Sequence, residues 1–455
     1  MAYSANSFCP EVWSQLEINM SGDYSLCCLA NYDKDFGIAV DKNGVPMNVL
    51  THSFEEALNS ETHKQHRLQL SRGEKPIRCR NCYDSEDVSK GTPEWGVAQA
   101  AGRSKRQRVI RKTAANIPAY IKIHEAPSVT NSETGETTSK VVNLHLRFGN
   151  LCNMKCVMCS PQHSNMWYDD WIALEYPQYE GKPIFKLGDY KTFEIKKDHH
   201  GRSRMDFEAW WEHPIWWERF NKVLPDLKYI YFTGGEPFLV PALEQCLDIL
   251  IDGGYAHDVT LRFDTNLTVI NTKIIEKLEK FKQVFMCISV DDIAERYEYI
   301  RYPGTYSKFT TNLARIKQTN IKISYISSCI GIASIYAMPR VCAVANEFDV
   351  PSSFRFLEGP KWLDIRYLPQ SAKLEIIEKY KTYYTDNNPK NLRWFKSMVR
   401  LLEKYIDESN TDFSKLEEFV RCMDILDAQR NTNWRVTLHD TYDLLKRHAP
   451  ALKNL

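Results

Sequence analysis

The hydrophobic positions of this chain fall into short runs separated by longer mixed stretches. Six runs, each of three to eight residues, are rich in aliphatic and aromatic side chains. They are Val141–Phe148, Tyr229–Phe232, Val259–Phe263, Val284–Val290, Ile321–Ser327 and Phe354–Phe356. Helix-like spacing of apolar residues lies between several runs, at Ala242–Ile251, Thr272–Phe281 and Ser307–Gln318. Because strands that alternate with helices form parallel sheets covered by helices, the pattern predicts an α/β fold over residues 141–360.

The regions on either side of this alternation have a different character. From residue 361 to 455, apolar residues recur at three- and four-residue spacing without a strand-like run, which predicts helices. Residues 1–95 are rich in cysteine and in turn-forming residues, and residues 96–140 are polar and end in a low-complexity stretch. We therefore predict a cysteine-rich module (1–95), a linker (96–140), the α/β region (141–360) and a helical C-terminal region (361–455).

A long tryptophan-rich segment separates the first two strand runs. Its tryptophans are Trp167, Trp171, Trp210, Trp211, Trp216 and Trp217, and a helix is predicted within Phe207–Val223. Two interpretations stay open. Either the aromatic side chains pack this segment against the sheet, or some of them line a substrate groove.

Composition narrows the class of protein. The chain has 455 residues, of which 43% are hydrophobic, and its formal net charge is +1. A near-neutral chain has no global field that attracts nucleic acid, so nucleic acid is not an expected partner. The basic run Arg103–Lys112 is interpreted as a solvated helix face or linker, with RNA, leader-peptide or phosphorylated-substrate binding as the alternative. No apolar run approaches membrane-spanning length and the first residues lack a signal-peptide core, so we expect a cytoplasmic protein without a membrane partner.

The cysteines are the first candidates for chemistry. Thirteen cysteines in a cytosolic chain indicate metal ligands and buried thiols rather than a disulfide framework. Three of them, Cys152, Cys156 and Cys159, form the loop CNMKCVMC directly after the first strand run. Three thiolates on one loop can hold three corners of a [4Fe–4S] cube, whereas ferredoxin-type clusters take four. The spacing therefore predicts a redox cluster whose fourth iron is open to a small ligand. Zinc sites more often use two separated Cys-x-x-Cys pairs.

A second motif follows the strand run Tyr229–Phe232. It reads Gly234-Gly235-Glu236-Pro237, immediately after Thr233. Glycines let the backbone approach a ligand closely, and ligands in parallel α/β folds bind at the carboxyl ends of the strands. Glu236 would offer an acceptor to an ammonium group at that edge.

The pair CNMKCVMC and GGEP resembles the radical S-adenosylmethionine (SAM) superfamily, over residues 141–360. The resemblance implies a partial (β/α)6 TIM-like barrel in which the cysteine loop follows the first strand. It implies that the amino and carboxylate groups of SAM chelate the open iron, and that the stretch Gly234, Gly235, Glu236 and Pro237 contacts the SAM amino group. Met158 stands where the family usually has an aromatic residue. Further SAM-binding positions implied by the resemblance are Asn266, after the third strand, and Ser289 and Asp291, after the fourth.

The N-terminal cysteines resemble the twitch module, a short form of the SPASM domain. The segments CPEVWSQLEINMSGDYSLCCLA and RCRNCYDSE carry this resemblance. It implies a second [4Fe–4S] cluster held by Cys9, Cys27, Cys79 and Cys82, with Cys28 as the rival to Cys27. A structural zinc ion on the same four thiolates is the alternative.

The resemblance also implies an activity. A flavodoxin or ferredoxin would donate an electron to the open cluster, which would cleave SAM to methionine and a 5′-deoxyadenosyl radical that abstracts hydrogen from the substrate. Cys152, Cys156 and Cys159 would be the catalytic ligands, and the auxiliary cluster would bind substrate or accept an electron. Two other classes stay open: a zinc-binding interaction protein, and a barrel that serves as a scaffold without cleaving SAM. The substrate, whether a peptide or a small molecule, is not predicted.

Overall fold

The computed structural model describes residues 3–5, 7–30, 37–80, 82–83, 120–175, 183–357, 359–387, 392–408 and 411–452. The basic run Arg103–Lys112 and residues 96–119 of the predicted linker lie outside these described residues. The predicted domain boundaries at residues 95, 140 and 360 stay a prediction.

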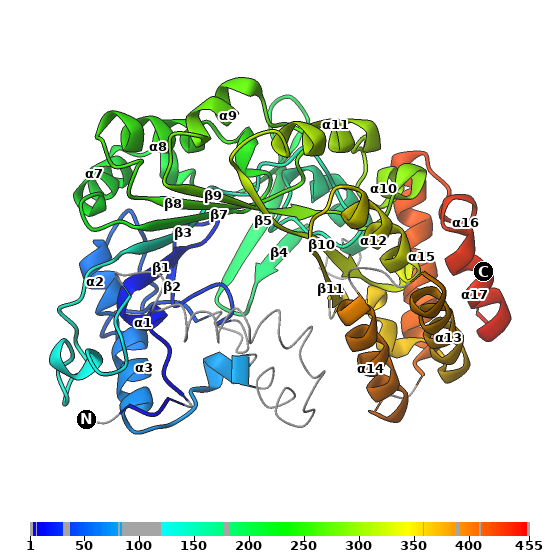
Figure 1. Ribbon diagram of the computed structural model, residues 1–455, viewed down its shortest axis with the longest axis horizontal. Helices are drawn as coiled ribbons and strands as arrows, with labels where there is room; N and C mark the ends of the chain where they lie inside the picture. The colour runs from blue at the N-terminus through cyan, green and yellow to red at the C-terminus, as the bar shows by residue number, and fades with distance from the viewer. Residues whose placement is uncertain are drawn as a thin grey trace.

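A mostly parallel sheet forms the centre of the molecule (Figure 1). Its order is β11-β10-β9-β8-β7-β3-β1-β2, and every neighbouring pair from β1 to β11 is parallel. The strands are β1 (Gln15–Ile18), β2 (Tyr24–Ser25), β3 (Asn143–Arg147), β7 (Tyr229–Thr233), β8 (Thr260–Thr265), β9 (Gln283–Ser289), β10 (Lys322–Ile330) and β11 (Ser352–Phe356). All six predicted runs are strands, and they lie side by side in sequence order. The predicted partial (β/α)6 barrel is confirmed.

Helices connect these strands and cover one side of the sheet. They are α7 (Pro214–Val223), α8 (Pro241–Asp252), α9 (Thr272–Leu278), α10 (Ala294–Ile300), α11 (Tyr306–Ile316) and α12 (Ala337–Glu347). Figure 1 shows α8, α9 and α11 over one side of the sheet. Their apolar faces are buried, for example Leu243, Leu247 and Leu250 of α8. The carboxyl ends of the parallel strands are thereby held at one edge, where the loops can converge.

The N-terminal region extends the central sheet. Strand β1 pairs in parallel with β3, opposing Leu16 to Leu144, and β2 pairs with β1 in the antiparallel sense. The nearby helical elements are α1 (Glu11–Ser14), α2 (Phe54–Leu58), α3 (Glu61–Ser71) and the short η1 (Ile77–Cys79). The cysteine-rich segment is thus joined to the barrel through the edge of its first strand, an arrangement that the sequence did not predict.

Residues 120–140 pack against the N-terminal elements. The Trp13 indole donates to Thr130 Oγ1 (2.8 Å), and Arg67 Nε donates to the Gly135 carbonyl (2.7 Å). Gly135 has a φ of +73°, and a Cβ there would collide with the Lys64 carbonyl oxygen. The low-complexity stretch therefore has a fixed turn that fits α3.

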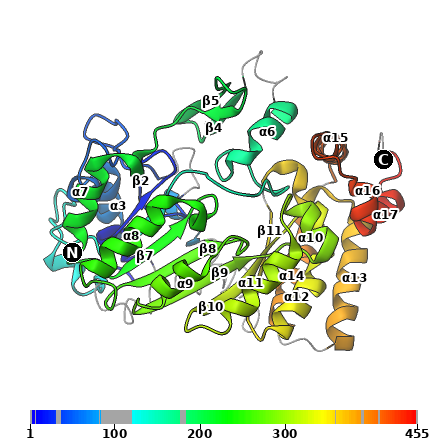
Figure 2. The same cartoon turned by 90° about the horizontal axis from the view of Figure 1, so that it is seen from above.

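The tryptophan-rich segment contains a small sheet that the sequence did not predict. Its elements are η3 (Asn165–Trp167), α6 (Tyr168–Glu175), β4 (Ile184–Leu187), β5 (Lys191–Lys197), β6 (Ser203–Met205) and η5 (Trp210–Glu212). Strands β4, β5 and β6 form an antiparallel sheet. Figure 2 shows the β4–β5 hairpin projecting from the central sheet beside α6. Trp167, Trp210 and Trp216 are buried in the main core, which supports the packing interpretation for these three.

The C-terminal region is helical, as predicted. It contains η8 (Lys361–Leu363), η9 (Ile365–Tyr367), α13 (Gln370–Asn387), α14 (Leu392–Glu408), α15 (Phe413–Arg430), α16 (Trp434–Thr437) and α17 (His439–His448). Figure 1 places these helices at the β11 end of the sheet, opposite α1–α3. Among the helices that the structure describes, none is long and apolar enough to cross a membrane.

Candidate cluster and cofactor site

The cysteine loop leaves the carboxyl end of β3 and is fixed by backbone hydrogen bonds. Lys155 N donates to the Tyr302 carbonyl (2.7 Å) and Val157 N donates to the Ile300 carbonyl (2.8 Å). The Cys152 N–H donates to Asn165 Oδ1 at 2.9 Å. The loop is therefore held between the end of α10 and η3.

The three thiols of the loop interact with one another. Burial is the main cause that raises the pKa of Cys152 to about 12, and the charges of Cys156 and Glu236 add to the rise. A hydrogen bond from Cys159 lowers the pKa of Cys156, and the same hydrogen bond, together with burial, raises the pKa of Cys159. Three soft sulfur donors thus lie within mutual reach, which is the donor chemistry that an iron–sulfur cluster needs.

A single metal ion needs a tighter arrangement of ligands. In the part of the chain that the structure describes, no group of three or more His, Cys, Asp or Glu side chains could hold a metal ion as it stands. A four-iron cube takes each thiolate at a different corner, so its ligands need not converge on one point.

The Gly-Gly-Glu-Pro motif packs directly on the cysteine loop. Glu236 N donates to the Leu151 carbonyl at 2.8 Å. A Cβ on Gly235 would collide with the Leu151 oxygen, and Gly234 has a φ of +124°. Gly235 is required because the backbone approaches the loop too closely for a side chain, and Gly234 is required because of its positive φ. This cradle joins the two sequence motifs into one site.

Glu236 is fully buried beneath this contact. Its Oε1 accepts from Thr265 Oγ1 (2.7 Å) and from Phe238 N (3.3 Å), and its Oε2 accepts from Asn266 N (2.8 Å). Glu236 caps the short helix η6 (Pro237–Leu239), which begins with Pro237. Burial raises its pKa to about 7, although these hydrogen bonds oppose the rise.

Asn266 also reaches the cysteine loop. Its Nδ2 donates to Asn153 Oδ1 (2.9 Å), and Asn153 Nδ2 donates to Thr268 Oγ1 (2.9 Å). Thr268 in turn donates to Asn266 Oδ1 at 2.6 Å. The end of β8 is therefore tied to the loop by a closed set of hydrogen bonds, of which the sequence identified only Asn266.

The residues at and after the end of β9 contact other residues of this chain. Asp291 lies 2.6 Å from Arg301 Nη2 in a buried ion pair and accepts from Cys329 N at 2.7 Å. The charge of Arg301 in turn contributes to lowering the pKa of Cys156. Ser289 ends β9 opposite Ser327 of β10. Asp291 thus reaches the cysteine loop through Arg301, a residue that the sequence did not single out.

A second buried charge network holds the loop from the other side. Lys155 Nζ lies 2.7 Å from Asp170 Oδ1, and Arg430 Nε lies 2.8 Å from Asp170 Oδ2. The Arg430 guanidinium also stacks over the rings of Trp167 and Tyr302, at 5.3 and 5.6 Å from their centres. The last residue of α15 is therefore part of the surroundings of the cysteine loop.

The N-terminal cysteines form a second cluster of thiols. Burial is the main cause that raises the pKa of Cys27. The nearby charges that add to the rise are those of Glu11, Cys28, Cys82 and Cys79. Cys28, Cys79 and Cys82 thus lie near enough to Cys27 for their charges to affect its pKa.

One histidine joins this group. Cys79 Sγ lies 3.2 Å from His66 Nε2. Burial lowers the pKa of His66 to about 3, with Arg78 and Arg67 adding to the effect, so its ring is neutral. The sequence did not indicate this contact, because the two partners are thirteen positions apart.

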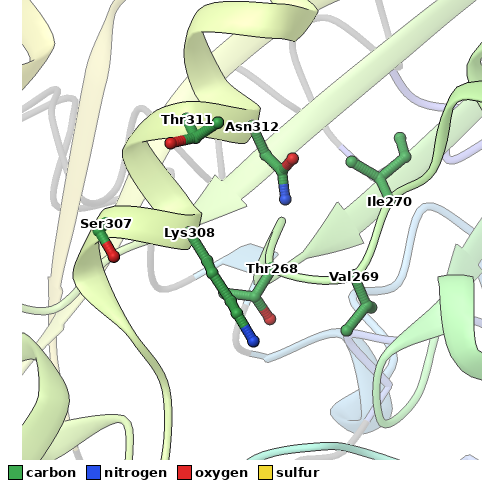
Figure 3. A pocket seen from close by; sticks show the side chains of 7 residues that line it. All are labelled: Thr268, Val269, Ile270, Ser307, Lys308, Thr311 and Asn312. Carbon is green, nitrogen blue, oxygen red and sulfur yellow. The ribbon is translucent and has the colours of Figure 1, made fainter.

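Two hollows lie near these groups. The larger one, about 380 Å³, opens beside the β8–α9 loop and α11 (Figure 3). Figure 3 shows its lining residues Thr268, Val269, Ile270, Ser307, Lys308, Thr311 and Asn312. The smaller one, about 180 Å³, is lined by residues of the N-terminal module, of the segment after the cysteine loop and of the β4–β5 hairpin.

Comparisons with known proteins agree with this arrangement. Residues 217–333 match the model of the radical SAM superfamily, and residues 9–83 match the iron–sulfur cluster-binding SPASM domain. The first match begins after the cysteine loop, and the second begins at Cys9 and ends one residue after Cys82. A comparison with curated proteins found no match.

Solved structures give more distant likenesses. Native anSMEcpe with bound AdoMet is 15% identical, over 54% of this chain and 61% of that chain, with a TM-score of 0.35. SuiB from Streptococcus suis is 11% identical over 86% and 71% of the two chains, also with a TM-score of 0.35. SuiB bound to its precursor peptide SuiA is 13% identical over 55% and 47%, with a TM-score of 0.34. The chain therefore spans 61% of the length of anSMEcpe. The two family matches confirm the resemblances predicted from the sequence.

Proposed function

We propose that this chain, a radical SAM enzyme with an N-terminal SPASM domain, holds its SAM-binding cluster on Cys152, Cys156 and Cys159 and cleaves SAM reductively. The observation that carries this proposal is the contact between the two motifs. Gly235 lies so close to Leu151 that any side chain would collide with it, and Glu236 N bonds to the same carbonyl. The loop with the thiols and the strand end with the carboxylate are therefore built as one unit.

The cofactors fit this donor set. Cys152, Cys156 and Cys159 would hold a [4Fe–4S] cluster that, when reduced, would supply the electron for cleavage of SAM to methionine and a 5′-deoxyadenosyl radical able to abstract hydrogen from the substrate. The three thiols offer three ligands, which leaves one iron for the amino and carboxylate groups of SAM. A flavodoxin or ferredoxin is the proposed electron donor.

Glu236 is the proposed acceptor for the SAM ammonium group. A carboxylate has about four acceptor sites, and Glu236 uses three of them on Thr265, Phe238 and Asn266. One site on Oε2 is left for the ammonium group. The positive charge would also favour the ionised carboxylate, which burial alone disfavours.

We also propose SAM contacts for the other positions that the family resemblance implies, which are Asn266, Asp291 and Ser289. Asn266 is positioned by Asn153 beside the cysteine loop. Asp291 is paired with Arg301, so we propose that it acts on bound SAM through that arginine or through a rearranged pair. Ser289 is the proposed hydroxyl contact at the end of β9.

For the auxiliary cluster we propose Cys9, Cys27, Cys79 and Cys82 as ligands, with Cys28 as the alternative to Cys27. The charges of Cys28, Cys79 and Cys82 all affect the pKa of Cys27, which supports Cys27, Cys79 and Cys82; Cys9 is proposed from the resemblance. The auxiliary cluster accepts an electron from the product radical or binds substrate. The substrate itself, a peptide or a small molecule, is left open.

The deciding experiment is a SAM-cleavage assay. Protein reconstituted without oxygen should form 5′-deoxyadenosine under dithionite, and its reduced EPR spectrum should change when SAM is added. Changing Cys152, Cys156 and Cys159 to alanine should abolish both results. Cys246→Ala is the matched control, because Cys246 is a buried thiol on α8 away from the loop and should leave both unchanged.

Iron content separates the proposal from its alternatives. Two four-iron clusters give about eight irons per chain, and the triple variant should keep about four that do not respond to SAM. About one zinc and four irons in the wild type would replace the auxiliary cluster with a structural zinc ion. If the wild type has full clusters but forms no 5′-deoxyadenosine, the barrel is better interpreted as a scaffold that does not cleave SAM.

A further inference from the structure

The smaller cavity is lined by four segments of the chain. Its walls are Glu17, Asn19, Ser25, Cys27, Cys28 and Ile38 from the N-terminal module, Arg147 from the end of β3, Gln162 and His163 from the segment after the cysteine loop, and Leu187 and Tyr190 from the β4–β5 hairpin. Cys27 and Cys28 of the N-terminal group therefore lie in the wall, together with residues that follow the cysteine loop in the sequence. With about 180 Å³ it is smaller than sites for whole drug-sized ligands, and it suits one functional group of a ligand.

We propose that this cavity binds an oxyanion group, a carboxylate or a phosphate, through the guanidinium of Arg147. The assignment of this group to the substrate rests on the proposed function. The binding of the anion to the cavity does not.

Arg147 is partly buried, and its guanidinium has an unpaired donor. The Nη2 atom is buried and has no hydrogen-bond partner among the described residues. Because most buried donors in proteins are satisfied, this atom is available to a ligand. Guanidinium groups bind carboxylates and phosphates through two parallel hydrogen bonds, so an oxyanion is the group that would satisfy this residue.

Two other polar groups of the wall have partners of their own. Glu17 accepts from Ser25 Oγ (2.9 Å) and lies 3.6 Å from His145 Nδ1. Tyr190 accepts from Asn19 Nδ2 at 2.9 Å. Neither of these interactions uses the unpaired Nη2 atom of Arg147.

Two further groups of the wall can bond to the anion. His163 is an exposed residue of the wall, and its imidazole can form a hydrogen bond beside the anion. The cavity thus offers one cation, an imidazole and the phenol of Tyr190.

The test measures anion binding without turnover. Cluster-loaded full-length protein, without SAM and without reductant, is titrated with ¹³C-labelled acetate or with inorganic phosphate, and binding is followed by the NMR line widths of the probe. Acetamide, the neutral counterpart of acetate, is the control ligand. Arg147→Gln is compared with Arg202→Gln, because Arg202 lies on an exposed turn and its ion-pair partner is Asp198 on the same turn.

We expect saturable binding to the wild type and to Arg202→Gln, at least about tenfold weaker binding to Arg147→Gln, and none of acetamide. Binding of acetate alone identifies a carboxylate, and binding of phosphate alone identifies a phosphate group. Equal affinity in Arg147→Gln, or no saturable binding of either anion to the wild type, overturns the proposal.

A second measurement guards against a folding defect. Because Arg147 has no ion-pair partner to lose among the described residues, Arg147→Gln without anion should unfold at the wild-type temperature or above it. A clearly lower unfolding temperature would mean that Arg147 is structural, and the proposal would be wrong. A protein that binds acetate at Arg147 but forms no 5′-deoxyadenosine would refute the proposed function and leave this inference standing, and the converse result would do the opposite.

Discussion

Asp170 is the residue whose replacement should most clearly reveal how the cysteine loop is held. Its carboxylate, 1% exposed, is shared by Lys155 at 2.7 Å and Arg430 at 2.8 Å, whose side chains are 14% and 2% exposed. Asp170→Asn keeps the shape of the side chain and removes its charge. Both cations then lose their counter-charge, and Arg430 Nη2 already lacks a hydrogen-bond partner among the described residues.

The expected cost follows from the burial of this pair. Removing one partner of a buried ion pair destabilises a protein by about 3–5 kcal/mol. Lys155 can turn partly toward water, so we expect a loss near the lower end, about 3 kcal/mol. The neighbouring Asp169 is the control, because its side chain is 62% exposed and bonds Lys197 at 2.7 Å on the surface. Asp169→Asn should cost about 1 kcal/mol or less.

The assay is urea unfolding of the two variants and the wild type at pH 7, at low and at high salt. The effect of Asp169→Asn should shrink at high salt because surface charges are screened, whereas the effect of Asp170→Asn should persist. Because Lys155 lies within the cysteine loop, Asp170→Asn should also retain less iron per chain after reconstitution. Losses for the two variants that agree within about 0.5 kcal/mol would refute the argument that the buried pair holds the loop.

Three further predictions concern the motifs. Burial raises the pKa of Glu236 to about 7, so the folded chain keeps a proton that the unfolded chain releases. Glu236 should therefore lower wild-type stability by about 3 kcal/mol as pH rises from about 4.5 to 7, and Glu236→Gln should remove this contribution in urea unfolding without SAM. Of Cys27→Ala and Cys28→Ala, made separately, only the variant of the true ligand should lose auxiliary-cluster iron; equal iron in both would refute a unique ligand. His66→Leu removes the contact with Cys79 Sγ and should shift the reduction potential of the auxiliary cluster, whereas an unchanged potential would make His66 a packing residue.

The sequence predicted the elements whose information is local. Each of the six strand runs is apolar and rich in residues that favour strands, so Val284–Val290 corresponds to β9 at Gln283–Ser289 with a shift of one residue. The cysteine loop and the Gly-Gly-Glu-Pro motif are contiguous stretches, and their chemistry is visible in the residue types. Their mutual contact was implied only by the order of parallel strands.

The parts that the sequence did not predict depend on distant partners. Strand β1 has four residues inside a turn-rich segment, and it is a strand because β3, more than one hundred residues later, offers a free edge. Strand β5 buries only Phe193 and Ile195, so its apolar–polar alternation is too short to predict a strand. Asp170 and Arg430 are 260 residues apart, so only the assembled fold brings them together. Asp291 carried the right residue type for a ligand contact, but its pairing with Arg301 depends on the packing of α10.

The cysteine loop is anchored by several elements of the fold, including the C-terminal helices. The loop is held by the backbone at Ile300 and Tyr302, by the bonds of its Asn153 to residues after β8, and by Lys155 through Asp170 and α15. A site whose ligands are positioned by several rigid elements binds its cofactor without first ordering the loop. Substitutions far from the loop in the sequence can therefore affect it, because Arg430 holds Asp170 from 260 positions away. The C-terminal helices therefore support the site as well as covering the β11 end of the sheet.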